Sequence, residues 1–131
     1  MVTPYLLKYD NGEGGRQIGP LIRINKKYKD DAGLLAHEIE HVKQWWIVSI
    51  ICFVLWLLFV PLSGLGLVFS WVPFVAYHLL YRIPAVQKWI EIRCWRVQLS
   101  YTPDRIDAAA RLLSTKYDFK MSYDEAVRAL S

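Results

Sequence analysis

The chain has 131 residues, of which 54% are hydrophobic and 15% aromatic, and its formal net charge is +4. This length suits one compact domain over residues 1–131 and leaves little room for a second. The basic residues are scattered among acidic ones and form no basic stripe of the kind that binds nucleic acid, so we expect no nucleic-acid partner.

The first 30 residues have the pattern of short strands. Residues 5–9 and 20–25 are apolar, and residues 10–15 between them form a turn-forming cluster with three glycines. A short N-terminal β-hairpin is the simplest interpretation. The extreme N-terminus lacks the basic region and apolar core of a signal peptide, so export by that route is not expected.

A helix is predicted from Ala32 onward. Asp30 and Asp31 precede it, where acidic side chains favour a helix N-terminus. Leu35, Ile39 and Val42 then recur at helical spacing. This stripe should face the core, with His37, Glu38 and His41 on an adjoining face.

Residues 45–81 are predicted to form a membrane-embedded helical hairpin. No Asp, Glu, Lys or Arg occurs from Gln44 to Tyr81, and residues 61–66 supply the tip. Each arm is somewhat shorter than the roughly 20 residues usual for a spanning helix. A hydrophobic core hairpin or an oligomer interface is the alternative. Basic residues, including Lys43 and Arg82, flank the open end of the hairpin. This placement indicates a lipid bilayer as partner and an active site on the cytoplasmic side of the inner membrane.

The remaining sequence predicts helices only. Pro84 suits the first turn of a helix over residues 84–101, and Thr102-Pro103-Asp104 starts another. Ser122 and Glu125 have capping-box spacing before a last short helix. The expected fold class is α+β, mainly α.

The segment His37-Glu38-Ile39-Glu40-His41 is a His-Glu-x-x-His motif. Residues four apart on a helix lie one turn above each other, so both imidazoles can bind one metal ion, most naturally Zn²⁺. Glu38 can accept a proton from a water on that metal. Two surface histidines on an amphipathic helix would give the same pattern without any metal.

Glu91 is the expected third ligand. If the apolar segment is an antiparallel hairpin with its tip near Leu65, Glu91 returns to the level of His37 and His41. Glu40, His78, Cys94, Asp104 and Asp118 are the competitors; Cys94 lies one turn from Glu91 and is otherwise a packing residue. Tyr28, Arg93, Arg96 and Tyr101 are candidates for stabilising an oxyanion, and the sequence does not choose among them.

The segment from Leu35 to Trp46, followed by the Glu-bearing segment from Trp89 to Leu99, resembles minimal zincin-like metallopeptidases of the gluzincin type, which occur in bacteria and phages. The resemblance implies zinc bound by His37, His41 and Glu91, with Glu38 as general base. Trp95 occupies the position where larger gluzincins carry an Asp. The sequence therefore does not identify the residue that would hydrogen-bond to the metal-binding histidines.

The expected function is that of a membrane-associated zinc peptidase acting on peptide or protein substrates. A carboxylate-bridged di-iron site would need a second Glu-x-x-His element, and only one copy is present. A non-enzymatic, membrane-anchored interaction protein with a structural or vestigial metal site is the main alternative. A closed structural site would have four protein ligands.

Overall fold

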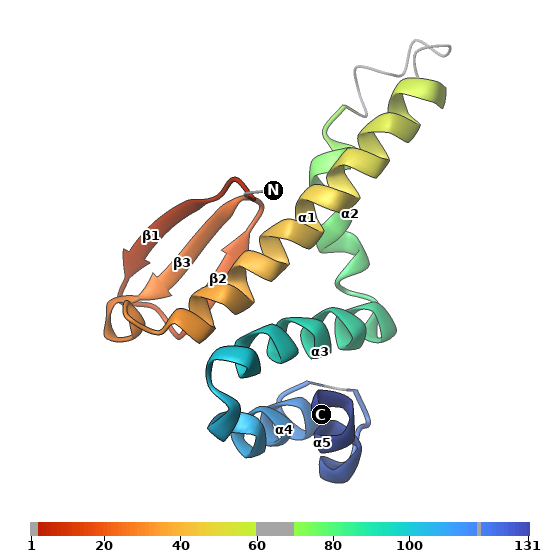
Figure 1. Cartoon of the computed structure of the whole chain (residues 1–131). Helices are drawn as coiled ribbons and strands as arrows, with labels where there is room; N and C mark the ends of the chain where they lie inside the picture. The colour runs from red at the N-terminus through yellow and green to blue at the C-terminus, as the bar shows by residue number, and fades with distance from the viewer. Residues whose placement is uncertain (1–2, 60–69, 118) are drawn as a thin grey trace.

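The computed structural model describes residues 3–59, 70–117 and 119–131. A small sheet precedes a series of helices (Figure 1), which confirms the expected α+β, mainly helical class. The strands are β1 (Leu6–Asp10), β2 (Gly15–Ile18) and β3 (Leu21–Asn25). The helices are α1 (Ala32–Phe59), α2 (Val72–Leu80), α3 (Pro84–Tyr101), α4 (Ile106–Thr115) and α5 (Tyr123–Leu130).

The sheet differs from the expected hairpin. Residues 5–9 and 20–25 do form neighbouring strands, but β1 and β3 run parallel, and β2 pairs with β3 on the other side in antiparallel fashion. Gly19, with a φ of 58°, allows the tight turn that joins β2 to β3. The hairpin prediction was therefore wrong in its pairing, because residues 15–18 form an additional strand. β2 is left as an edge strand.

Helix α1 continues without a break from the polar body into the apolar segment. Its N-terminus is capped by Asp31, whose Oδ1 accepts a hydrogen bond from the Leu34 amide at 2.9 Å. Val42 packs against the buried Ile22 and Ile24 of the sheet. Beyond Trp46, α1 packs on α2, and much of its apolar surface is exposed. Figure 1 shows α1 and α2 leaving the body side by side.

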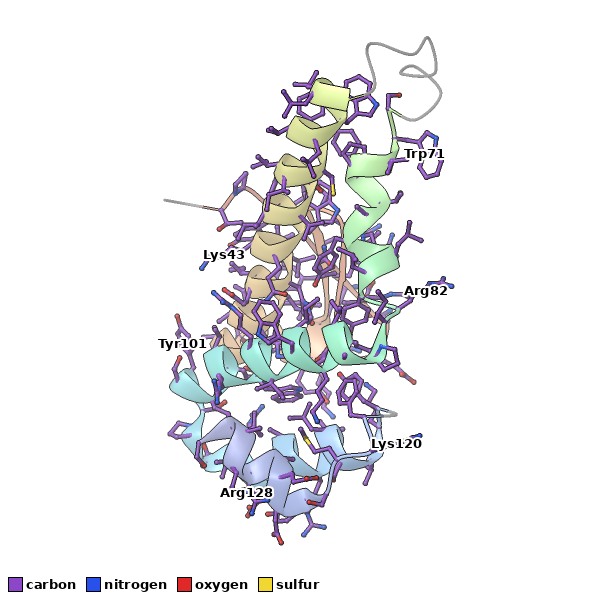
Figure 2. The ribbon with its side chains drawn as sticks, turned by 90° about the vertical axis from the view of Figure 1, so that its right-hand side faces the viewer. Lys43, Trp71, Arg82, Tyr101, Lys120 and Arg128 are labelled. Atoms are coloured by element: carbon purple, nitrogen blue, oxygen red, sulfur yellow. The ribbon has the colours of Figure 1, made fainter. Side chains whose placement is uncertain are left out.

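The helix from Ala32 to Leu58 is long and apolar enough to cross a membrane, a test that core helices of soluble proteins also pass. The expected second arm is represented by α2, and the expected tip over residues 61–66 lies outside the described residues. Lys43 and Arg82 project on either side below the apolar end, and Trp71 lies near that end (Figure 2).

Helix α3 begins at Pro84, as predicted, and crosses beneath the start of α1 (Figure 1). Helices α4 and α5 pack below it around a core of Leu99, Ala109, Ala110, Leu113, Phe119, Met121, Ala126 and Leu130. Both hydrogen bonds of the predicted Ser122–Glu125 capping box are present at the start of α5. These helices hold α3 against α1, which fixes the position of the site between them.

Candidate metal centre

His37 and His41 lie one turn apart on α1 and are both buried. Their Nε2 atoms face each other at 3.2 Å. Burial lowers the pKa of both imidazoles, to about 3 for His37, although Glu91 and Glu40 act in the opposite direction on His41. Both rings are thus neutral near pH 7, the form that binds metal ions.

Glu91 of α3 reaches the same place. Its Oε2 lies 3.8 Å from His37 Nε2, and its Oε1 lies 3.6 Å from His41 Nε2. The carboxylate is buried. The structure therefore brings together the three residues expected to bind the metal.

The hairpin register from which Glu91 was predicted is nevertheless wrong. A tip near Leu65 would set Trp45 level with Ala85. Instead, Trp45 Nε1 donates to the Phe74 carbonyl at 2.9 Å. Residues 82–83 turn the chain after α2, and α3 then crosses back under α1. The turn, rather than a uniform hairpin, returns Glu91 to the histidines.

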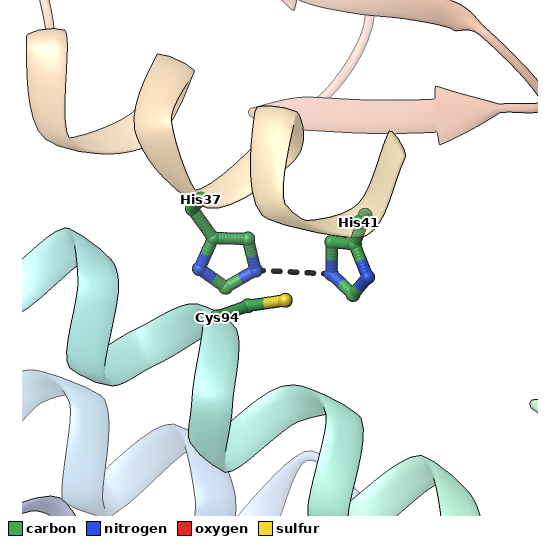
Figure 3. Close-up of side chains that lie close together, drawn as sticks. All are labelled: His37, His41 and Cys94. Carbon is green, nitrogen blue, oxygen red and sulfur yellow. Dashed lines mark hydrogen bonds between the residues drawn. The ribbon is translucent and has the colours of Figure 1, made fainter. Parts of the chain in front are cut away.

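Cys94 also lies at this point. It is completely buried, and its Sγ and one nitrogen each of His37 and His41 all lie within 4.8 Å of one another (Figure 3). These three residues could hold a metal ion. Burial, with the nearby Glu91, raises the pKa of the Cys94 thiol, so without a cation it stays protonated. The Gln44 amide is its hydrogen-bond donor at 3.8 Å.

The other proposed ligands have different roles. Glu40 pairs with Lys43 at 3.6 Å and also with Arg93 of α3. His78 lines the site, but its Nε2 accepts a hydrogen bond from the Gly19 amide at 3.3 Å. Asp104 is exposed, and Asp118 lies outside the described residues.

Glu38 is buried beside the ligand cluster and is approached closely by β2. Burial raises its pKa to about 8, and the charge of Glu91 acts in the same direction. A Cβ added to Gly15 would lie 2.5 Å from Glu38 Oε1. Any larger residue here would therefore require the Glu38 carboxyl group to move.

Three tyrosines that the sequence did not single out complete the site. Tyr81 and Tyr117 donate hydrogen bonds to the two carboxylate oxygens of Glu91, the latter at 3.0 Å. Tyr77 Oη lies 2.9 Å from His41 Nδ1. They come from α2 and from the segment after α4, so no local spacing could have linked them to the motif. The four oxyanion candidates from the sequence are not among the residues lining the cavity: Tyr28, Arg93, Arg96 and Tyr101.

The outward nitrogen of His37 has a different environment from that of His41. His37 Nδ1 and Gln98 Oε1 are both buried, and neither has a well-formed hydrogen bond within the described residues. Burial and His41 lower the pKa of His37, whereas the nearby Gln98 side chain acts in the opposite direction. The indole of Trp95 packs edge-on against the same ring, with centroids 5.0 Å apart. Gln98 therefore lies where a partner of His37 is needed.

A cavity of about 340 Å³ opens over this cluster. Its lining includes Gly15, Arg16, Gln17, His37, Glu38, His41, Tyr77, His78, Tyr81, Glu91 and Tyr117. Two neutral imidazoles, a carboxylate and a nearby thiol are donors that suit a zinc ion. Glu38 and Glu91 are two buried carboxyl groups in this lining, and Arg16 is the one Lys or Arg among the residues named. A divalent cation would balance the charge of these carboxyl groups.

No protein-family model, curated protein or solved structure matches the chain. Function is therefore inferred from the geometry and chemistry of the site.

Proposed function

We propose that the protein is a zinc-dependent peptidase of the minimal zincin type. The observation that carries this proposal is the meeting of His37, His41 and Glu91 at the base of a cavity that also holds Glu38. A His-Glu-x-x-His motif alone is a weak signal. Here a third donor comes from another helix and reaches the same two nitrogen atoms.

His37, His41 and Glu91 are the proposed ligands. Three protein ligands leave a coordination position free, and a zinc ion held there would activate a water molecule and polarise the scissile carbonyl. The hydroxyls of Tyr81 and Tyr117 orient the Glu91 carboxylate, and Tyr77 orients His41.

Glu38 is the proposed general base. Its side chain lies in the cavity next to the ligands, and its raised pKa reflects a buried carboxyl group that faces Glu91. A cation between the two carboxyl groups would favour the ionised form of Glu38. Glu38 would then accept a proton from the attacking water and deliver it to the leaving amine.

The peptide substrate would bind in extended form along β2. Gly15, Arg16 and Gln17 of this edge strand line the cavity, and an edge strand has free backbone groups that can pair with a peptide.

Membrane attachment is part of the proposal. The apolar end of α1 exposes Ile47, Ile50, Ile51, Phe53, Val54, Leu55, Leu57 and Leu58, and α2 exposes Phe74 and Leu79. Such a surface is larger than a soluble monomer usually presents to water. Burial in the inner membrane would place the metal site at its cytoplasmic surface, near peptide segments close to the bilayer.

A second function is favoured by one observation. Cys94 Sγ lies close enough to His37 and His41 to serve as a fourth ligand together with Glu91. Four protein ligands would close the site and make it structural, in a membrane-anchored interaction protein without enzymatic activity.

Cleavage of a casein labelled for fluorescence tests the proposal. Protein reconstituted in nanodiscs should cleave casein when loaded with zinc, lose this activity on chelation and regain it when zinc is returned. Glu91→Ala should be inactive at the same zinc concentration, whereas Cys94→Ser should remain active. Activity that depends on Cys94 but not on Glu91 would make Cys94 the third ligand in place of Glu91. No cleavage by the zinc-loaded protein would favour the structural site.

A further inference from the structure

A second cavity adjoins the metal site at the start of β2. It has a volume of about 520 Å³ and is lined by Asp10, Gly12, Glu13, Gly15, Arg16, Arg23 and Lys116. Gly15 and Arg16 line both cavities. An extended peptide bound along β2 at the metal site would therefore have this second cavity beside it.

Two arginines lie side by side in the lining of this cavity. Arg16 of β2 and Arg23 of β3 are direct cross-strand partners, so their side chains lie on the same face of the sheet. Like charges in directly opposite positions destabilise a sheet. Neither guanidinium group has an ion pair or hydrogen bond among the described residues, so nothing within the described part of the chain offsets this repulsion.

A third cation comes from another element. Lys116, directly after α4, lines the same cavity and precedes Tyr117, which contacts Glu91 in the metal site. Helix α4 and the β2–β3 pair thus contribute positive charge from two sides. The cavity is positioned between the sheet and the tyrosine that helps to hold the metal ligand.

The two acidic lining residues do not neutralise these cations by direct pairing. Asp10 Oδ1 accepts a hydrogen bond from the Gly12 amide at 2.9 Å, which stabilises the turn after β1. Neither Asp10 nor Glu13 forms an ion pair with Arg16, Arg23 or Lys116 in the described part of the chain. The cavity therefore contains two neighbouring arginines and a lysine whose positive charges are available to bind an anion.

We propose that this cavity binds a carboxylate of the substrate, so that the enzyme selects peptides with an acidic group close to the cleaved bond. The inference rests on the proposed peptidase function, and it names the substrate class. Arg16 and Arg23 present guanidinium groups suited to a carboxylate, and Lys116 adds a third donor. The carboxylate belongs to an Asp or Glu side chain or to the peptide C-terminus.

The test uses decapeptides with the full chain in nanodiscs. In the first set, a single Glu is moved along an otherwise neutral sequence with an amidated C-terminus. The second set carries Gln in place of this Glu. The third set has the Gln sequence with a free C-terminal carboxylate. Cleavage by the zinc-loaded protein is followed by mass spectrometry. Binding is measured separately by fluorescence anisotropy with the zinc-loaded Glu38→Gln variant. One Glu position, or the free C-terminus, should be preferred roughly ten-fold over its neutral counterpart.

Arg23→Gln and Lys116→Gln should each reduce this preference several-fold. Lys8→Gln is the matched control, because Lys8 is the cross-strand partner of Arg23 on β1 but does not line the cavity. Equal loss in Lys8→Gln would overturn the proposal in favour of general surface charge, and so would equal handling of the three peptide sets. If peptides with the carboxylate bind more tightly but the unaltered protein cleaves none of them, the anion site is supported and the peptidase function is rejected.

Discussion

The two halves of α1 reverse the usual relation between residue type and burial. In the first half, the polar residues His37, Glu38 and His41 are between 5% and 7% exposed. In the second half, Ile50 is 56% exposed and Leu58 is 62% exposed. One continuous helix therefore buries these polar residues in its first half and exposes large apolar residues in its second half.

The difference shows that the two halves are adapted to different surroundings. Buried polar groups are costly unless they are paired or bind a metal, and the first half meets partners from α2 and α3. Exposed apolar surface costs about 25 cal/mol per Å² in water, and this cost disappears in a hydrocarbon environment. The first half thus has the features of a site, and the second those of a membrane segment.

The largest expected effect comes from the polar half. Glu38→Gln keeps the shape of the side chain but removes its ability to accept a proton. We expect kcat/KM on casein to fall by about 10²–10⁴-fold while zinc content is unchanged. Zinc analysis of the same preparation checks this split. Loss of the metal together with activity would instead make Glu38 a structural residue.

Membrane insertion of the apolar half of α1 should be sensitive to an added charge, not to the loss of a hydrogen-bonding or metal-binding group. Leu55→Arg places a cation on an exposed position of α1 and should disfavour membrane insertion by about 2.5–3.5 kcal/mol. The measurement is the fraction of protein that stays in the membrane after carbonate extraction. Ala108→Arg, at an exposed position of α4, is the control. Equal extraction of both variants would contradict a membrane role for this half.

Gly15→Ala tests how closely β2 approaches the polar half. The added methyl group would collide with the Glu38 carboxyl group and displace it. A displacement of about 1 Å can lower the rate up to a hundred-fold, so kcat should fall while zinc affinity and Tm change little. Gly12→Ala is the control, because Gly12 lies in the turn and meets the Asp10 side chain instead. Full activity of Gly15→Ala would show that Glu38 need not stay in place.

The smallest expected effect concerns the partner of His37. Gln98→Met preserves the packing volume but removes the polar amide group near His37, and zinc affinity should fall about ten-fold. Gln98→Glu supplies a stronger acceptor and should retain or raise that affinity. Competition with a chelator gives both values. If the two variants behave alike, Gln98 only fills space.

The sequence predicted the features that local signals encode. The helix starts at Asp31, Pro84 and Ser122 follow from capping chemistry, and the spacing of His37 and His41 follows from helix geometry. Strand pairing was predicted incorrectly because the parallel β1–β3 contact is non-local. Cys94 was named as a competing ligand or else a packing residue, and the structure places it, buried, beside both histidines.

Glu91 shows the limit of such reasoning most clearly. Its position beside the histidines was anticipated, but from an assumed hairpin register that the contacts of Trp45 and Tyr77 contradict. The turn after Tyr81 determines where α3 lies. The tyrosines that hold Glu91 come from segments whose distance to α1 depends on the same turn, so the sequence alone could not identify them.

X-ray absorption of the zinc-loaded protein tests the central claim most directly. The account predicts about one zinc per chain, coordinated by nitrogen and oxygen atoms at about 2.0–2.2 Å, with no sulfur ligand. Glu91→Ala should lose the metal, and Cys94→Ser should leave the spectrum unchanged. A sulfur atom at about 2.3 Å, or a protein that cannot be loaded with zinc, would contradict an open site formed by His37, His41 and Glu91.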